Sequence, residues 1–152
     1  MSVQRLSLSE LVAVVGGALL LVSLFLPWYG LSDNPNAVLA GSRDGPFTGW
    51  EVHRLLRWVL LPAAIAPLIL AYIIVRDHEL SWARGELTAV VAIAAFGLVA
   101  FNGLIDRPGS PSGEISLQWG YFVALGGTLL AMGGSILRSA ESGRERKPPG
   151  VL

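Results

Sequence analysis

Four side chains with possible chemical roles lie in one polar stretch of the sequence: Asp33, Asp44, Glu51 and His53. A carboxylate close to a histidine can support general acid–base catalysis, so Glu51 and His53 form a possible polar site. No nucleophile elbow, phosphate-binding loop or metal-ligand spacing accompanies them in the sequence. The pattern therefore favours a solvated loop over an enzyme, and we assign no catalytic residue.

Metal, thiol and nucleic-acid chemistry find little support in the composition. The second histidine, His78, lies beyond the next apolar segment, so a zinc or haem site that used both histidines is not expected. The chain has no cysteine, which excludes disulfides, thiolate ligands and thiol redox chemistry. Its net charge is zero, which gives no reason to expect nucleic acid as a partner. We assign no metal and no cofactor.

The elements that must position these residues are four long apolar runs. The chain is 53% hydrophobic and only 14% charged, whereas about 25% is typical of globular proteins. Four segments contain no Asp, Glu, Lys or Arg: 11–32, 58–75, 87–105 and 115–137. About 20 helical residues cross a bilayer, and backbone groups in lipid must pair within their own segment. We therefore expect an all-α membrane protein, an antiparallel bundle of four transmembrane helices in a lipid bilayer.

Capping signals help to set the helix bounds. Ser7 with Glu10, and Thr48 with Glu51, have the spacing of capping boxes, in which a side chain and a backbone amide pair reciprocally. The second helix also contains Pro62, which favours a kink. The polar tail 139–152 is predicted to be disordered and cytoplasmic. The remainder, 1–138, is predicted to form one transmembrane domain with helices at about 8–28, 49–75, 86–104 and 116–137.

Aromatic and polar residues near the ends of the runs indicate where the membrane surface lies. Six aromatic residues are at positions typical of headgroup anchors: Trp28, Tyr29, Trp50, Trp58, Trp82 and Trp119. Arg54 and Arg57 are expected to extend their guanidinium groups towards the headgroups. Asn102 and Gln118 are the strongly polar residues in or near the last two runs, where they could hydrogen-bond across the third and fourth helices.

Basic residues are unevenly distributed about the four runs. Seven of the eleven Lys and Arg residues lie in the N-terminal segment, the second loop and the C-terminal tail, and four lie in the first and third loops. This distribution predicts that both termini are cytoplasmic and that the first loop is outside. Arginine dominates over lysine, and Ala, Gly, Val and Leu are abundant, as in GC-rich bacteria. We therefore expect a multi-pass protein of a bacterial cell (inner) membrane.

Small residues recur at alternating spacings of four and three in the last run, which draws one line along a helix face: Gly120, Ala124, Gly127, Ala131 and Gly134. Such a seam allows a neighbouring helix to approach closely. We expect it to face the interior of the bundle, because the first and third helices carry small residues too. Gly126 and Gly133 form a second line, which could serve a membrane-protein partner or a second copy of the chain.

Two resemblances follow from these motifs. The segment from Leu24 to Tyr29, followed after a polar loop by Thr48-Gly49-Trp50-Glu51, resembles uncharacterised four-helix integral membrane proteins of high-GC Gram-positive bacteria. That resemblance implies a fold but no activity. The layout is also similar to the claudin-like tetraspan family, which would imply an adhesion or barrier role. This chain lacks that family's cysteine pair, and its first loop is shorter.

The sequence thus leaves three functional hypotheses. The first is a non-enzymatic accessory, scaffold or partner- and lipid-binding subunit, because packing surface is plentiful and chemistry is scarce. The second is an oligomeric transporter or channel subunit, with Pro62 and Pro67 kinking the second helix around a path. The third is an outer-face enzyme that uses Glu51 and His53.

Overall fold

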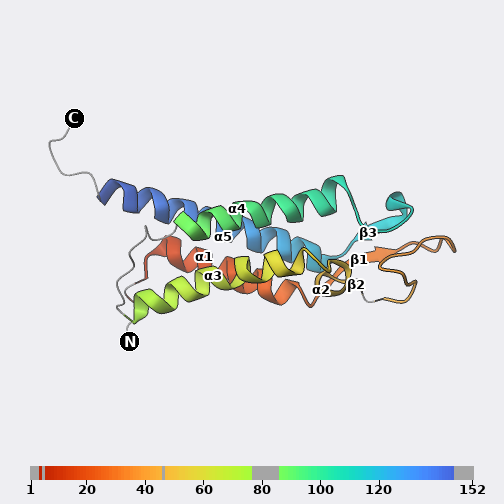
Figure 1. Ribbon diagram of the computed structural model, residues 1–152, viewed down its shortest axis with the longest axis horizontal. Coiled ribbons are helices and arrows are strands. Elements are labelled where there is room, and N and C mark those ends of the chain that lie inside the picture. Colours follow the sequence, from red (N-terminus) through yellow and green to blue (C-terminus); the bar gives the residue numbers. More distant parts are fainter. Residues whose placement is uncertain (1–3, 5, 46, 77–85, 146–152) are drawn as a thin grey trace.

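The structure is a computed structural model that describes residues 4, 6–45, 47–76 and 86–145. Its main elements are four apolar helices that pack together and a small sheet at one end of them (Figure 1). The helices are α1 (Leu8–Ser23), α2 (Gly49–Val52), α3 (Arg57–Val75), α4 (Glu86–Ala100), the π-helix η2 (Phe101–Ile105), the 3₁₀-helix η3 (Ser112–Glu114) and α5 (Trp119–Glu145). The strands are β1 (Pro27–Leu31), β2 (Phe47–Thr48) and β3 (Ile115–Leu117).

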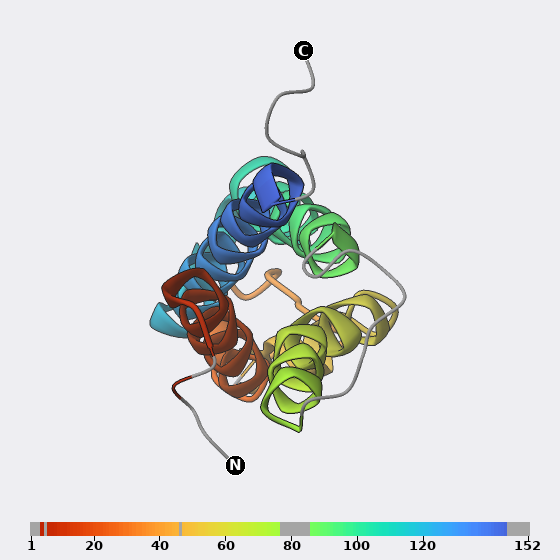
Figure 2. The ribbon, with the colours of Figure 1, turned by 90° about the vertical axis from the view of Figure 1, so that its left-hand side faces the viewer.

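The four main helices alternate in direction, so α1 begins and α5 ends at the same end of the bundle (Figure 1). We call this the terminal end and the opposite one the sheet end. Viewed from the terminal end, α1 lies between α3 and α5, and α4 completes the ring (Figure 2). In the described part of the chain, three segments are long and apolar enough to cross a membrane: Arg57–Val75, Glu86–Ile105 and Trp119–Glu141. Helix α1 is apolar too, but shorter. Together these segments indicate a multi-pass membrane protein.

A three-stranded antiparallel sheet closes the sheet end, in the order β2-β1-β3. Tyr29 in β1 pairs with Phe47 of β2 on one side and with Leu117 of β3 on the other. The all-α prediction is therefore wrong in this respect. Strands β1 and β3 lie inside two of the apolar runs, 11–32 and 115–137, so hydropathy alone did not separate them from the helices, whereas β2 lies in the first loop.

The first helix ends earlier than the predicted residue 28. Regular helix stops at Ser23, and hydrogen-bonded turns continue to Leu26. Pro27 has no amide proton to donate to the carbonyl of Ser23, so one helical hydrogen bond is lost where α1 ends. The indole Nε1 of Trp28 donates to that carbonyl instead, at 2.6 Å. The proline thereby turns the chain from helix into strand β1.

The second predicted helix, 49–75, is divided into α2 and α3. Both predicted capping boxes are confirmed, with Ser7 and Glu10 at the start of α1 and Thr48 and Glu51 at the start of α2. The break follows at His53, whose backbone is not helical (φ −102°, ψ 76°). From Arg57 onwards, α3 is continuous through its two prolines.

The last two predicted helices differ from the observed ones mainly at their ends. The third matches α4 together with η2, in which Asp106 N donates to the carbonyl of Phe101. The fourth begins at Trp119 instead of 116, because 115–117 pairs with β1. It continues to Glu145, so the predicted disorder is wrong for 139–145, while 146–152 lie outside the described residues.

The small-residue seam of α5 lies against α1. A Cβ atom at Gly134 would meet the backbone of Ser9 and Ala13, and one at Gly127 would lie 2.8 Å from the amide nitrogen of Leu20. Ala124 and Ala131 are buried on the same face. At the sheet end, Gly120 fits against the backbone of Leu26 and Pro27. Small residues on both helices thus bring their backbones close together, as membrane helix pairs do.

Candidate functional sites

The sheet end encloses a buried aromatic cluster of Trp28, Tyr29, His53 and Tyr121. Strand β1 supplies the first two, the break between α2 and α3 supplies His53, and α5 supplies Tyr121. Trp28 and Tyr121 are 0% exposed and Tyr29 is 2% exposed. Gly49 lies directly on the indole ring of Trp28, where any side chain would clash. Three segments that are distant in the sequence therefore meet at these rings.

Hydrogen bonds satisfy the polar atoms of this aromatic cluster. The Tyr29 hydroxyl is 2.8 Å from Nε2 of His53, and it donates to the carbonyl of Asn102 at 3.3 Å. The Tyr121 hydroxyl donates to the carbonyl of Val99 at 2.9 Å. The rings pack edge to face, with the Trp28 centroid 5.5 Å from that of His53 and 5.9 Å from that of Tyr121. Edge-to-face packing at these distances stabilises aromatic pairs.

Burial shifts the protonation of this cluster towards its neutral forms. Loss of solvation lowers the pKa of His53 to about 4. Burial, reinforced by the neighbouring Tyr121, raises the pKa of the Tyr29 hydroxyl, although the charge of Arg107 opposes the shift. At neutral pH the imidazole and the phenol are therefore both uncharged, which suits a structural hydrogen bond.

The predicted polar site of Glu51 and His53 is not formed. His53 is 7% exposed and bonds to Tyr29, whereas the exposed Glu51 caps α2 through the amide of Thr48. Among the described residues, no hydrogen bond or ion pair joins the two side chains. The break in the helix at His53 turns the imidazole inward, so these residues do not form a catalytic pair.

The predicted headgroup anchors fall into two groups. The anchor role of Trp28 and Tyr29 is wrong, because β1 places both side chains inside the protein. Trp58 and Trp119 are each 58% exposed, and Trp50 is half-buried. Trp82 lies outside the described residues. Trp50, Trp58 and Trp119 thus keep at least part of their side chains exposed, and their role as headgroup anchors stays a prediction.

Asn102 and Gln118 do not bond to each other as the sequence suggested. The Asn102 side chain donates to the carbonyl of Leu98 in its own helix at 2.9 Å. The Gln118 side chain donates to the hydroxyl of Ser116 at 3.3 Å, next to the sheet. Both amides thus make local contacts, and the cross-helix contact near this level is that of Tyr121 with Val99.

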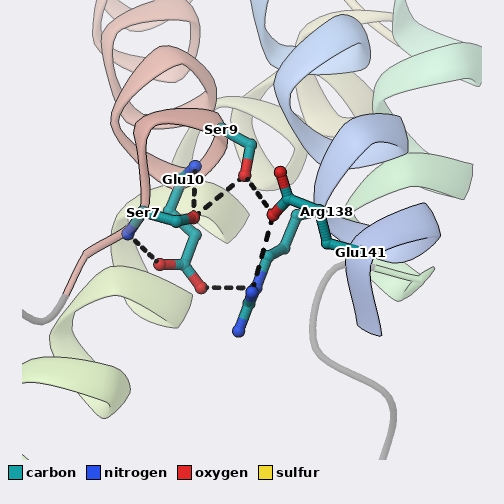
Figure 3. Close-up of polar contacts among 5 residues, drawn as sticks. All are labelled: Ser7, Ser9, Glu10, Arg138 and Glu141. Atoms are coloured by element: carbon teal, nitrogen blue, oxygen red, sulfur yellow. Dashed lines mark hydrogen bonds and ion pairs between the residues drawn. The ribbon is translucent and has the colours of Figure 1, made fainter. Parts of the chain in front are cut away.

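A second polar cluster joins α1 to α5 at the terminal end (Figure 3). Oε1 of Glu10 lies 2.8 Å from Nε of Arg138, an ion pair without the alignment of a good hydrogen bond. Arg138 also lies near Glu141, at 3.6 Å, and the Ser9 hydroxyl donates to Glu141 at 3.0 Å. The Glu10 side chain is only 4% exposed. The sequence predicted that Glu10 caps the first helix, but it did not predict the ion pair with Arg138.

A small cavity of about 10 Å³ adjoins this ion pair. All four main helices contribute to its lining, among them Glu10, Pro67, Thr88 and Ser135. The Ser135 hydroxyl is buried and has no hydrogen-bond partner among the described residues. The space is about that of one water molecule, and a water there would have polar neighbours.

Two surface features remain unfilled by the chain itself. A Cβ atom added at Gly126 or Gly133 would meet nothing within 4 Å, so this second small-residue line of α5 is open. Beside the sheet, a surface groove of about 460 Å³ lies between the first loop and α2. Its lining mixes apolar and polar residues and carries both signs of charge: Ala40, Ser42, Asp44, Gly45, Phe47, Glu51 and Arg54.

The arrangement offers little for metal chemistry. Within the described part of the chain, no three His, Asp or Glu side chains lie close enough together to hold a metal ion. The groups that the sequence did not single out are the Tyr29–His53 pair and the Glu10–Arg138 pair. Comparison of the chain with protein-family models, with curated proteins and with solved structures finds no match.

Proposed function

We propose that this chain is a four-span integral membrane protein that works as a non-enzymatic accessory or scaffold subunit. In this proposal α1 crosses the bilayer together with the three longer segments. Its outward side chains support this, because Val15 and Val22 are exposed and apolar on a helix whose other side packs on α5. With its last turns to Leu26, α1 is long enough to span a thinned bilayer.

The proposed orientation places both termini in the cytoplasm of a bacterium and the sheet end outside. The excess of basic residues on the terminal side supports it, as does the resemblance to four-helix membrane proteins of high-GC Gram-positive bacteria. The groove beside the sheet then faces the outside, where it is accessible to another protein.

One observation carries the scaffold proposal: the hydrophobic core runs without interruption from the helices into the sheet end. A single cluster of buried residues includes Leu20 and Ala64 in the helices, Trp28 and Phe47 in the sheet, and Leu39 in the first loop. The sheet end is therefore fixed in position relative to the helices. A docking surface benefits from such preorganisation, because less freedom is lost on binding.

Photo-crosslinking in native membranes tests this proposal. A benzophenone amino acid at Ser42 in the groove should give a discrete crosslinked product, and the same group at the exposed Ile93 of α4 serves as the matched control. A third variant at Gly126 tests the open face of α5. The absence of a discrete product at both Ser42 and Gly126 would contradict a scaffold role, and a product of twice the chain mass would identify a second copy as the partner.

A further inference from the structure

The turn between α2 and α3 holds an arginine between two tryptophans. The Arg57 guanidinium carbon is 4.9 Å from the centroid of the Trp50 ring and 5.5 Å from that of the Trp58 ring. The two indole rings are 5.8 Å apart and meet edge to face, and Phe25 of the turn after α1 stacks on Trp50 at 5.6 Å. Cation–π contacts of this kind fix the guanidinium at a defined place.

One nitrogen of this guanidinium has no partner among the described residues. Nη1 of Arg57 donates to the carbonyl of Trp50 at 3.2 Å, while Nε is buried without a hydrogen-bond acceptor. An unpaired buried donor is costly, so the protein does not satisfy the hydrogen-bonding capacity of Arg57 by itself. A guanidinium group donates strong, charge-assisted hydrogen bonds to a phosphate.

The surroundings of Arg57 combine positive charge with exposed apolar surface. Arg54 is exposed three residues earlier in the same turn, and no ion pair holds it among the described residues. Leu55 between them is 85% exposed and Trp58 is 58% exposed. Two carboxylates, Asp44 and Glu51, line the surface groove together with Arg54, and Glu51 accepts a hydrogen bond from the amide of Thr48. Two guanidinium groups thus lie beside apolar side chains where α3 leaves the sheet end.

We propose that the turn from Arg54 to Trp58 binds the phosphate of an anionic phospholipid. Arg57 and Arg54 contact the phosphate oxygens, and Leu55 and Trp58 lie among the upper parts of the acyl chains. The charge of the two guanidinium groups favours an anionic lipid over a zwitterionic one. This inference rests on the proposed membrane insertion of the helices, because α3 must enter the bilayer next to this turn.

Lipid retention in native mass spectrometry tests the proposal. The purified chain in uncharged detergent is given phosphatidylglycerol and phosphatidylcholine at equal mole fractions. The unmodified chain should retain the anionic lipid in preference, by about tenfold for two charge-assisted contacts. The double variant Arg54→Gln/Arg57→Gln should lose this preference. Arg43→Gln, which removes one exposed arginine from the first loop, is the matched control and should keep it.

Three further measurements make the result decisive. Arg54→Gln alone, which removes no hydrogen bond, ion pair or ring contact among the described residues, should lower the preference even if the double variant unfolds. Inorganic phosphate at the same concentration should not displace the lipid, and displacement would overturn the proposal in favour of a simple anion site. Equal retention of both lipids by the unmodified chain would also overturn it. Extraction of membranes with alkaline carbonate separately tests insertion, so that failure of the lipid site is distinguishable from failure of the proposed function.

Discussion

The two ends of the bundle are closed by different kinds of contact. At the sheet end, four buried aromatic rings from β1, α5 and the segment between α2 and α3 pack together under a strand ladder. At the terminal end, the ion pair between Glu10 and Arg138 joins α1 to α5, supported by neighbouring serine and glutamate side chains (Figure 3).

This difference shows where the stability of the fold resides. Buried aromatic rings contribute through the apolar area removed from water and through their packing. A largely buried ion pair contributes less, because the cost of removing both charges from water offsets much of their attraction. Changes at the sheet end should therefore lower the free energy of unfolding more than changes at the terminal end.

The largest effect is expected for Trp28→Ala. Its ring is fully buried and its Nε1 supplies the Ser23 carbonyl with the donor that Pro27 lacks. We expect a loss of about 4 kcal/mol in the free energy of unfolding, measured by denaturant unfolding in detergent micelles. Trp119→Ala, at a 58% exposed tryptophan, is the control and should change it by less than about 1 kcal/mol. Equal losses for the two variants would show that the aromatic cluster is not the stabilising element.

Acid should weaken the sheet end through His53. Above pH of about 6.5 the imidazole is neutral in both the folded and unfolded chain, so it has no effect on stability. As the pH falls from about 6.5 to about 4, the unfolded chain binds a proton that the folded chain excludes. The free energy of unfolding should therefore decrease by up to about 3 kcal/mol over this range and level off below it.

His53→Gln is the control for this pH dependence. Glutamine retains a polar group near the Tyr29 hydroxyl but does not titrate, so the difference between the two unfolding curves isolates the histidine. A decrease of the same size in both proteins between pH 6.5 and 4 would show that the acid sensitivity does not come from His53.

A smaller effect is expected for Glu10→Gln at the terminal end. The change leaves Arg138 without its closest counter-charge, and we expect a loss of about 2 kcal/mol in the free energy of unfolding. The double variant Glu10→Gln/Arg138→Gln should lose less than the sum of the two single variants, because both charges are then removed. Additive losses would mean that the two residues do not interact. Glu141→Gln, at a 46% exposed side chain, should have little effect.

The smallest effect is expected for Tyr29→Phe, which keeps the ring and removes the hydroxyl. The variant loses the hydrogen bonds to His53 and to the Asn102 carbonyl, and we expect a loss of about 1 kcal/mol in detergent unfolding. Tyr72→Phe, at the exposed end of α3, is the matched control and should be neutral. A loss as large as that of Trp28→Ala would mean that hydrogen bonds, not ring packing, hold the sheet end together.

The sequence predicted the helical part of the fold well. Long uncharged runs can satisfy their backbone groups in lipid only as helices, so the four helices follow from composition alone. The two capping boxes were also predictable, because they depend on residues three positions apart. The seam of α5 follows in the same way from the helical period, and its contact with α1 agrees with the close approach that small residues permit.

The aromatic cluster and the polar cluster of Glu10 and Arg138 were not predicted, because the members of each are distant in the sequence. Glu10 and Arg138 belong to helices at opposite ends of the chain, and local spacing does not reveal such a pair. Trp28 and Tyr29 have the composition of a membrane anchor, and only the pairing of β1 with two later segments buries them. Pro27 was the available signal, since it ends α1 before the aromatic residues and allows the chain to become a strand.

The most direct test of the account is the side of the membrane on which each end of the bundle lies. Because the chain has no cysteine, single cysteines can be placed at Gln4, Ser42 and Ala140 and labelled with a membrane-impermeant maleimide. If all four helices cross, Ser42→Cys is labelled in intact cells, and Gln4→Cys and Ala140→Cys are labelled only after the membrane is opened. Labelling of Gln4→Cys and Ser42→Cys from the same side would show that α1 does not cross, and would contradict the four-span bundle.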